Sequence, residues 1–491
     1  MKEANVKICL ADALTKVFFH GLPEEILCKD LRLSAAAGEK TSFQLACFAE
    51  EAVDGLRLSL PEGCELFREI YVDSKKGKLP DALFPVPRGA ELSLEEGTNA
   101  FWITFTSRKV GAGSLSLSLS RGEACLFSAE IPTHIYDAPF PEAYRCGTNT
   151  GIGRADLCGA LGLKWEDYAA GNEETVTAVE EAYRKTYEFL VNYGLSPSSL
   201  PYPLGDPRAE SYLDDPRVTS FVLPWNAEEE TLRAWRAILA EHPAWAKKAM
   251  FYPVDEPMTV AALNTLAERA KTLRATFPEA TVVTPLHRDL MLDEKTDSFR
   301  FLEGITNLWC PKAALFSDYV YSEEQKAKFP PIGERMRARK RVGDRLWWYV
   351  CCEPAAPYAN VHMDLDLIEA RVLFWQQAKE EVDGFLYWSS TYWRNTEDVF
   401  VSAPHYQMGV TPVYGDGVLC YFRDGEPIPS VRLMALEEGM RDFARLCALK
   451  EKDPALAAEL LEKIAGRVDA FPRDKAAFLR ARERLFEALD A

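Results

Sequence analysis

Alternating apolar and polar residues mark the first part of the chain as β structure. Residues 114–120 switch strictly between serine and leucine, which is typical of a strand with one buried and one wet face. Short segments of this kind recur between turns, and they predict a β-sandwich over residues 1–138. The other strands predicted there are residues 41–48, 56–60, 69–72 and 100–106.

The expected role of this region is structural. A carbohydrate-binding module is the functional alternative, but the sequence shows no cluster of exposed aromatic residues to support it. Residues 132–141 contain closely spaced prolines, which disfavour both helices and central strands. We therefore predict the linker to the next region there.

After the prolines, short apolar runs alternate with segments of helical periodicity. Strands that alternate with helices and total eight predict an α/β fold, a (β/α)8 TIM barrel over residues 142–425. The predicted strands are residues 144–149, 195–202, 218–223, 248–254, 281–286, 305–309, 345–352 and 384–389. The predicted helices between them are residues 174–192, 228–241, 260–277, 322–341 and 365–379.

The last part of the chain is helical. Residues 426–491 are predicted as an extension packed on the barrel, with amphipathic helices at 430–446, 454–470 and 474–489. Ser430 is the predicted N-cap of the first. The stretch before it, residues 394–429, is predicted to be irregular, with a hairpin-type turn at Gly415, Asp416 and Gly417.

Composition and charge narrow the possible partners. The 491 residues include 57 basic and 75 acidic side chains, giving a formal charge of −18, which repels nucleic acid and anionic membranes. No apolar run is long enough for a signal peptide or a membrane span, so we expect a soluble, cytoplasmic protein. The oligomeric state is left open.

Cysteine and histidine spacing argues against a metal or a cofactor. The twelve cysteines include one adjacent pair, Cys351 and Cys352, which fits neither a redox motif nor a zinc knuckle, and the six histidines are dispersed. We predict reduced thiols, no metal and no cofactor.

The candidate chemistry lies at residues 252–257, Tyr-Pro-Val-Asp-Glu-Pro. Asp255 and Glu256 follow the fourth predicted strand and precede a predicted helix, the position where barrels carry their catalytic residues. The alternative is structural: an aspartate that caps a helix, with Pro257 in its first turn.

Aromatic residues gather near the ends of the later strands. Indole rings stack on the C–H faces of sugars, while hydroxyls need polar partners such as Asn360, Arg394 or Asn395, so the pattern favours a glycan ligand. Some of these rings must belong to the core, because alternation prevents Trp347 and Trp348 from both pointing inward. The rings are those of Trp225, Trp309, Trp347, Trp348, Tyr349, Tyr387, Trp388, Tyr392 and Trp393.

Several segments, in order along most of the chain, resemble glycoside hydrolase family 123 and the wider uncharacterised group that shares its catalytic domain. They are residues 79–85, 98–105, 252–257, 347–360, 383–393, 415–421 and 429–443. The resemblance implies an exo-acting retaining β-N-acetylgalactosaminidase that uses substrate-assisted catalysis, with an oligosaccharide or glycoside as its partner.

The resemblance also implies residue roles. Glu256 would be the general acid/base, and Asp255 would orient the 2-acetamido group and stabilise the charge on the oxazolinium nitrogen. Glu256 must carry a proton to donate it, and an ionised neighbour in a partly apolar site favours that state. Tyr349 first, and Tyr387 second, would hydrogen-bond the acetamido oxygen. The predicted substrate-binding residues are Trp348, Tyr349, Asn360, Tyr387, Trp388 and Trp393.

Two alternatives stay open at this point. Glu353, followed by Pro354 after the seventh predicted strand, would pair with Glu256 as the nucleophile of an ordinary two-carboxylate retaining glycosidase. An aspartate beside the acid suits an oxazolinium better than a neutral hexose, which favours the substrate-assisted route. The other alternative is a non-catalytic glycan-binding barrel.

Overall fold

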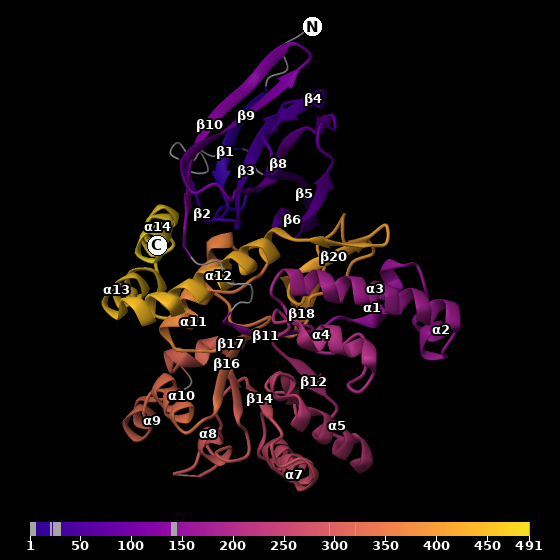
Figure 1. Ribbon diagram of the computed structural model, residues 1–491, viewed down its shortest axis with the longest axis vertical. Coiled ribbons are helices and arrows are strands. Elements are labelled where there is room, and N and C mark those ends of the chain that lie inside the picture. Colours follow the sequence, from indigo (N-terminus) through magenta and orange to yellow (C-terminus); the bar gives the residue numbers. More distant parts are fainter. Residues whose placement is uncertain are drawn as a thin grey trace.

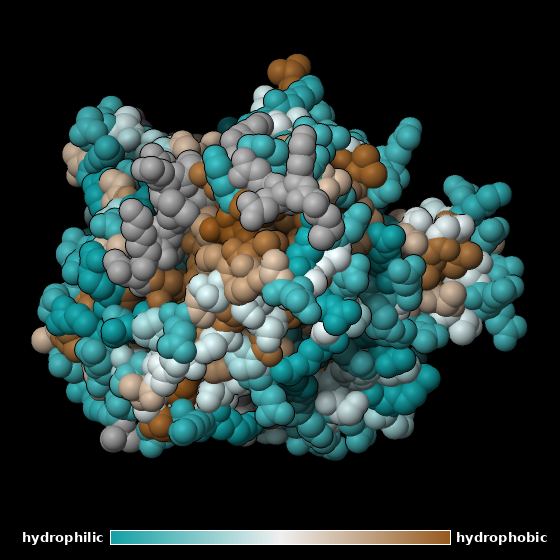
Figure 2. All heavy atoms as spheres, turned by 90° about the horizontal axis from the view of Figure 1, so that it is seen from above, coloured by the Kyte–Doolittle hydropathy of each residue, from teal (hydrophilic) through white to brown (hydrophobic). Residues whose placement is uncertain are grey.

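The computed structural model describes residues 6–19, 22, 31–138, 145–293, 295–319 and 321–490. A sheet-rich N-terminal region occupies one end of the molecule and an α/β region the other, and helix α12 runs along the boundary between them (Figure 1). Seen from the sheet-rich end, the surface is mostly hydrophilic, with hydrophobic side chains gathered near the middle of this face (Figure 2).

Two five-stranded sheets form the N-terminal region and share one apolar core. The alternation at residues 114–120 predicts this correctly, since Leu115, Leu117 and Leu119 are buried. The first sheet has the order β1 (Val6–Asp12), β3 (Lys40–Ala49), β8 (Gly97–Thr106), β5 (Cys64–Ser74) and β6 (Gly77–Val86). The second has the order β2 (Leu33–Ala36), β10 (Ala124–Tyr136), β9 (Gly111–Arg121), β4 (Val53–Ser59) and β7 (Leu92–Leu94).

The linker predicted over residues 132–141 begins inside the last strand of the N-terminal region. β10 continues to Tyr136, so Pro132 lies inside a strand. The pairing of β10 with β2 begins only at Thr133, which makes Pro132 an edge position on that side, where a proline is accepted. Residues 139–144, with Pro139 and Pro141, lie outside the described part of the chain.

Short parallel strands alternate with helices in the α/β region. Five form one sheet, in the order β11 (Gly147–Thr150), β17 (Gly384–Tyr387), β16 (Arg345–Val350), β15 (Leu308–Pro311) and β14 (Val283–Leu286). Two more, β12 (Phe221–Leu223) and β13 (Ala249–Phe251), pair with each other.

A few backbone hydrogen bonds join these two sheets at both ends. The Phe251 N–H donates to the carbonyl of Thr281, just before β14. On the other side, the Ser198 N–H donates to the carbonyl of Thr150, and the Val222 N–H to that of Ser198. The predicted strand at 195–202 is therefore reduced to one parallel bridge at Pro197, because a proline offers no N–H to extend the pairing.

The helices around these strands are α1 (Arg154–Ala160), α2 (Trp165–Ala169), α3 (Glu173–Asn192), α4 (Glu210–Asp214), α5 (Glu229–Glu241), α6 (Pro243–Ala246), α7 (Val260–Thr276), α8 (Ser298–Phe301), α9 (Glu323–Lys328), α10 (Ile332–Arg341) and α11 (Leu367–Lys379), with 3-10 turns η2 (Pro207–Ala209) and η3 (Ala313–Ser317). Four of the five predicted helices match α3, α5, α7 and α11, and further short helices occur around these strands. The single helix predicted over 322–341 is wrong: Pro330 and Pro331 divide it into α9 and α10.

The stretch predicted to be irregular contains two hairpins. β18 (His405–Met408) pairs with β19 (Thr411–Tyr414), and β20 (Cys420–Arg423) with β21 (Glu426–Pro429). Gly415, Asp416 and Gly417 lie between β19 and β20, which do not pair with each other, so these residues do not form the predicted hairpin turn.

Three helices end the chain: α12 (Val431–Lys452), α13 (Pro454–Ala465) and α14 (Lys475–Leu489). Ser430 caps α12 as predicted, because its hydroxyl accepts a hydrogen bond from the Leu433 N–H at 3.1 Å. α12 packs against α11 closely enough that a Cβ at Gly439 would lie 2.5 Å from the Phe374 ring. Among the described residues, no helix has the length and apolar character needed to cross a membrane.

α12 is buried on nearly all faces rather than amphipathic. Its buried arginines meet carboxylates of the N-terminal region, and its Asp442 meets arginines of α11 and α14. We call this cluster the ionic junction. Arg432 makes two 2.7 Å contacts with Asp81, and Arg445 makes contacts of 3.0 and 2.7 Å with Glu39. The junction comprises Glu39, Asp81, Arg371, Arg432, Asp442, Arg445 and Arg482.

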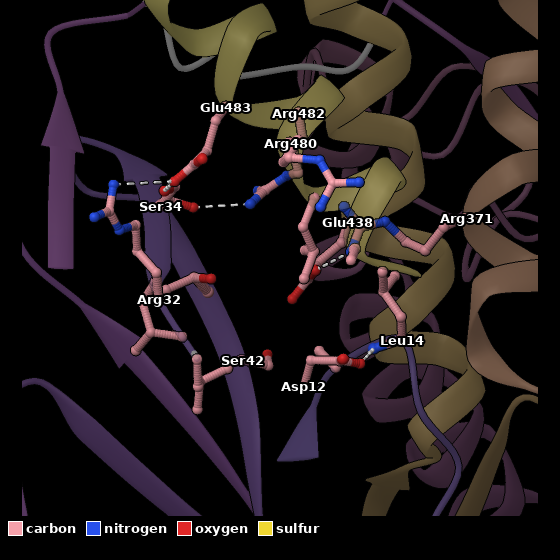
Figure 3. Close-up of a pocket in the computed structure, with 16 residues that line it drawn as sticks. Asp12, Leu14, Arg32, Ser34, Ser42, Arg371, Glu438, Arg480, Arg482 and Glu483 are labelled. Atoms are coloured by element: carbon pink, nitrogen blue, oxygen red, sulfur yellow. Dashed lines mark hydrogen bonds and ion pairs between the residues drawn. The ribbon is translucent and has the colours of Figure 1, made fainter. Parts of the chain in front are cut away.

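A cavity of about 550 Å³ opens beside the ionic junction. In it, Arg482 from α14 donates to the carbonyl of Ser34 at 2.8 Å, and Arg371 from α11 contacts Glu438 from α12 (Figure 3). None of the predicted site residues lines this cavity.

Candidate active site

The predicted strand, loop and helix around Asp255 and Glu256 are present. β13 ends at Phe251, and α7 begins at Val260. The N-cap of α7 is Thr259, whose hydroxyl accepts a hydrogen bond from the Ala262 N–H at 3.1 Å. Asp255 is therefore not the helix cap, and the structural alternative for this aspartate does not hold.

Both acids line one pocket of about 530 Å³. The pocket lies where the parallel strands end, because several lining residues are next to last in a strand or follow directly after it. The lining residues are Asn149, Ser198, Val222, Tyr252, Asp255, Glu256, Pro285, Tyr349, Cys351, Cys352, Leu386, Trp388, Tyr406 and Asp416.

Strand alternation decides which aromatic rings reach this pocket. On β16, Trp347 and Tyr349 pack in the interior cluster between the strands, whereas Trp348 packs in the outer cluster with the helices. Trp347 fills the interior beneath the site, where a Cβ at Gly147 would lie 2.5 Å from its ring. On β17 the same alternation turns Leu386 inward and Tyr387 outward, so Trp388 faces the pocket.

A tyrosine hydroxyl donates to each acid. Tyr252 donates to Oδ1 of Asp255 at 2.7 Å, and Tyr349 donates to Oε1 of Glu256. Burial raises the pKa of both tyrosines well above their usual range, so both stay protonated near neutral pH. Each of the two adjacent acids thus has its own fixed hydroxyl donor in the pocket.

The loop that carries the acids is held in an unusual conformation. Glu256 has a φ of +37°, in the left-handed region that residues with a side chain rarely adopt. Arg269 from α7 donates to the carbonyl of Pro253 at 2.7 Å, and its guanidinium lies 4.4 Å from the centre of the Trp225 ring. These contacts tie the loop to the helix that follows it.

Glu353, the alternative nucleophile, is engaged elsewhere and does not line the pocket. Its Oε2 accepts from Nζ of Lys312 at 2.6 Å and lies 3.0 Å from Nε2 of His287. The Lys312 ammonium lowers the pKa of Glu353. The pair is half-shielded from water, since the Lys312 side chain is 2% exposed and that of Glu353 37%.

Four of the six predicted substrate-binding side chains do not line the pocket. Trp348 packs edge-on against Phe316, and the Asn360 amide donates to the carbonyls of Cys351 and Pro354. Tyr387 is fully buried. The Trp393 indole donates to the carbonyl of Cys420 at 2.8 Å. Tyr349 and Trp388 are the two that line it.

Asp416 is a pocket residue that sequence reasoning missed. It is 1% exposed, and its Oδ1 accepts from Nε1 of Trp388 at 3.1 Å. Burial raises the pKa of Asp416 to about 6. A signal exists in the sequence, because residues 415–421 carry part of the family resemblance, but the Gly-Asp-Gly pattern itself predicts a turn.

Two thiols also belong to the pocket wall. The sulfur atoms of Cys351 and Cys352 lie 3.9 Å apart. The Cys351 thiol, which hydrogen-bonds to Cys352, lowers the pKa of Cys352, and the same contact raises the pKa of Cys351. All cysteines in the described part of the chain are free thiols, whereas Cys28 lies outside it.

Comparison with known proteins places this site in context. Residues 225–449 match the family model described as glycoside hydrolase 123, catalytic domain. The predicted resemblance to this family is thereby confirmed, and it supports a glycosidase acting on a carbohydrate. No curated protein matches the chain in sequence.

One solved structure agrees with the family match at the level of fold. A family 123 glycoside hydrolase from Clostridium perfringens, studied for glycolipid glycan hydrolysis, superposes with a TM-score of 0.71 at 12% identity, covering 99% of this chain and 97% of that one. A family 39 glycoside hydrolase from Bacteroides cellulosilyticus gives a TM-score of 0.33 at 10% identity, covering 84% and 82%.

Proposed function

We propose that this protein is an exo-acting retaining glycoside hydrolase that cleaves terminal β-linked N-acetylhexosamine, with β-GalNAc as first choice and β-GlcNAc as second. The observation that carries the proposal is the joint presence of Asp255 and Glu256 in one pocket that Trp388 also lines. The exposed indole offers a stacking surface for a sugar, and the adjacent acids supply the two roles that substrate-assisted cleavage needs.

In the proposed reaction, the acetamido oxygen attacks the anomeric carbon while the bond from that carbon to the leaving oxygen breaks. Glu256 donates its proton to the leaving oxygen. Asp255 stabilises the positive charge on the oxazolinium nitrogen. Water then adds to the anomeric carbon and gives a proton to Glu256, which restores both the acetamido group and the acid.

Tyr349 is the proposed hydrogen-bond donor to the acetamido oxygen. Its hydroxyl lies in the pocket and donates to Glu256 in the absence of substrate, so a bound acetamido group would take over that donor. The second candidate, Tyr387, accepts from the Gly417 N–H at 2.9 Å and is buried, which favours Tyr349.

The contacts of Glu353 favour this route over the two-carboxylate mechanism. A nucleophile needs an oxygen facing the anomeric carbon. Glu353 lies outside the pocket lining, and its Oε2 is bound to Lys312 and His287. The same pairing suits a structural role for Glu353 at the ends of β15 and β16.

We also propose that the parallel strands close into a (β/α)8 barrel between an N-terminal β-sandwich, residues 1–138, and a C-terminal extension, residues 426–491. The pairing within the two parallel sheets and the backbone contacts that join them at both ends support this closure. A barrel over residues 142–425 would place the pocket at its C-terminal face, where such folds carry their chemistry.

Hydrolysis of nitrophenyl glycosides by the purified protein tests the function. We expect release from the β-GalNAc or β-GlcNAc substrate and none from plain β-hexosides. Activity on a plain β-hexoside alone would contradict the acetamido mechanism. Sugar binding without turnover on any aglycone would instead favour the non-catalytic alternative.

A second experiment separates the mechanisms. If the acetamido group is the nucleophile, a thiazoline mimic of the oxazoline inhibits strongly, and Asp255→Asn loses much of the rate, whereas Glu353→Gln keeps most of it. A covalent adduct on Glu353 after reaction with a 2-fluoro glycoside, seen by intact-protein mass spectrometry, would overturn the proposed route.

A further inference from the structure

The Trp388 ring is held in place from several sides. Trp388 follows the last residue of β17 and is 37% exposed. Among the described residues that line the pocket, it is the one tryptophan. Tyr392 and Tyr406 flank it, with ring centres 4.9 and 6.0 Å away. A ring used for sugar stacking must keep part of its surface accessible, and Trp388 is exposed and lines the pocket.

Gly417 supports the back of the ring. A Cβ at this position would lie 2.4 Å from the indole, so only glycine lets the backbone approach so closely. Gly417 has a φ of +77°, which is also a glycine conformation. Its N–H donates to the Tyr387 hydroxyl, which anchors the turn to β17.

Asp416 holds the polar edge of the same ring. Its Oδ1 accepts from Nε1 of Trp388 at 3.1 Å and lies 3.4 Å from the Tyr387 hydroxyl. Oδ2 is buried and has no hydrogen-bond partner within the described chain. Burying an incompletely paired carboxyl group is costly, so a core position alone does not account for an aspartate here.

We propose that Asp416 is a positioning residue that, through its hydrogen bond to Nε1, fixes the Trp388 indole as the sugar-facing wall of the pocket. The identity of the ligand as a sugar rests on the proposed function; the positioning of the ring does not. Asp416 is itself 1% exposed and acts through Trp388. The raised pKa of its carboxyl, about 6, agrees with this burial.

The orientation of the ring can be measured without any substrate. In protein labelled with 5-fluorotryptophan, the ¹⁹F resonance of Trp388 is assigned by its loss in Trp388→Phe. We expect one sharp resonance in the parent, and a shifted or broadened one in Asp416→Ala. Trp393 is the internal control, because its N–H is held by Cys420 and its resonance should not change.

Conservative replacement distinguishes positioning from general structural support. Asparagine keeps an oxygen acceptor, so Asp416→Asn should leave the Trp388 resonance near its parent position even if Asp416→Ala does not fold. Gly417→Ala, which pushes a methyl group against the ring, should displace the resonance with Asp416 in place. An unchanged Trp388 resonance in Asp416→Ala, or a changed one in Asp416→Asn, would overturn the proposal.

Kinetics then connect the ring to the substrate. With nitrophenyl β-GalNAc, Asp416→Ala should raise KM about ten- to a hundredfold, the loss expected for a hydrogen bond to a charged group, with a smaller change in kcat. In the Trp388→Phe background, which lacks the N–H, the same substitution should raise KM no further. Equal losses in both backgrounds would contradict action through Trp388.

The two proposals fail in different ways. If no acetamido sugar is cleaved but the Trp388 resonance responds to Asp416→Ala and not to Asp416→Asn, the function is wrong and the positioning role stands. If the sugar is cleaved and the resonance does not respond, the positioning role is wrong and the function stands.

Discussion

Glu256, the proposed general acid, has an unfavourable backbone conformation. A left-handed conformation costs a residue with a Cβ about 1–2 kcal/mol relative to its usual regions. The neighbouring Asp255 and Pro257 and the bond from Arg269 to Pro253 keep the loop in place. The acid is therefore presented to the pocket at the expense of local stability.

Replacing Glu256 should separate activity from stability. Glu256→Gln should lower the rate about a hundred- to ten-thousand-fold, most for poor leaving groups, because an amide donates no proton. Glu256→Ala and Glu256→Gly should both be inactive, but the glycine variant should be about 1 kcal/mol more stable, since it relieves the strained φ. Urea denaturation gives this comparison, and a less stable glycine variant would contradict it.

Glu69 on β5 is a second residue with a large energetic effect. It is fully buried, and one of its oxygens lacks a hydrogen-bond partner in the described chain. Burial raises the pKa of Glu69 to about 8. Because the folded-state pKa lies above the unfolded value, the protein loses stability as the pH rises from about 4.5 toward 8.

Glu69→Gln should remove this loss. The two proteins should have similar pH dependence below pH 4.5, and the variant should then gain on the parent by on the order of 1 kcal/mol per pH unit up to about pH 8. Unfolding free energies at pH 5, 6, 7 and 8 test this. Parallel curves for the two proteins would show that Glu69 is not protonated in the fold.

For individual residues, the sequence predicts some members of the candidate site and not others. Asp255 and Glu256 are adjacent in the chain, so a motif reveals them. Alternation shows that only one of Trp347 and Trp348 points inward, but which one depends on the register of β16, set by pairing with distant strands. Asp416 reaches the pocket only because the chain folds, and neither its burial nor its contact with Trp388 can be predicted from the residues beside it in the sequence.

Among the elements, the ends of β13, β16 and β17 carry most of the site, and α12 connects it to the rest of the molecule. Ser430, at the start of α12, is buried and makes two hydrogen bonds through its side chain. The Ser430 hydroxyl accepts from the Leu433 N–H and donates to the carbonyl of Leu419 at 2.6 Å. It therefore links the residue before β20 to the helix as well as capping the helix.

Ser430→Ala should destabilise the protein by about 1–2 kcal/mol, because the Leu433 N–H and the Leu419 carbonyl would both lose their hydrogen bond to the Ser430 hydroxyl. KM and kcat should be unchanged. Ser322→Ala is the matched control, since Ser322 caps the short, exposed helix α9, and its loss should be smaller. Thermal unfolding measures both, and an equal or larger effect at Ser322 would contradict the assignment.

Helices and strands with strong periodicity were predictable. The helices expected at 174–192, 228–241 and 365–379 match α3, α5 and α11 within two residues. The expectations that failed, at 195–202 and 322–341, contain prolines whose effect on pairing and helix continuity outweighs the apolar pattern. The charged residues of α12 predict a solvent-exposed face. They are buried instead, because they pair with Glu39 and Asp81, which lie far away in the sequence.

For the molecule as a whole, the ionic junction is the main polar contact between the sheet-rich region and the helices. Arg371 and Arg482 bind Asp442 at 2.7 and 3.0 Å, and all three side chains are buried. Despite the cost of burial, the surrounding arginines lower the pKa of Asp442 to about 2. The charged pairs therefore persist across the usual pH range.

Asp442→Asn should destabilise the protein by about 3 kcal/mol near pH 6, because it leaves buried arginines without a counter-charge. The folded-state pKa lies below the unfolded value, so this contribution is complete above about pH 4 and is lost as the pH falls toward 2. The gap between parent and variant should shrink over that range. Glu459→Gln, at an exposed pair with Arg484, is the control and should have a much smaller effect, because water screens exposed pairs.

The ionic junction also bears on how such a chain can evolve. Accessory domains on flexible linkers can be gained, lost or exchanged by recombination, because a breakpoint in the linker leaves both parts intact. A breakpoint after the sheet-rich region of this chain would leave Glu39 and Asp81 on one fragment and Arg432 and Arg445 on the other. A foreign partner would rarely supply matching buried charges, so the two regions are expected to be inherited together, and diversity should accumulate in the loops around the pocket.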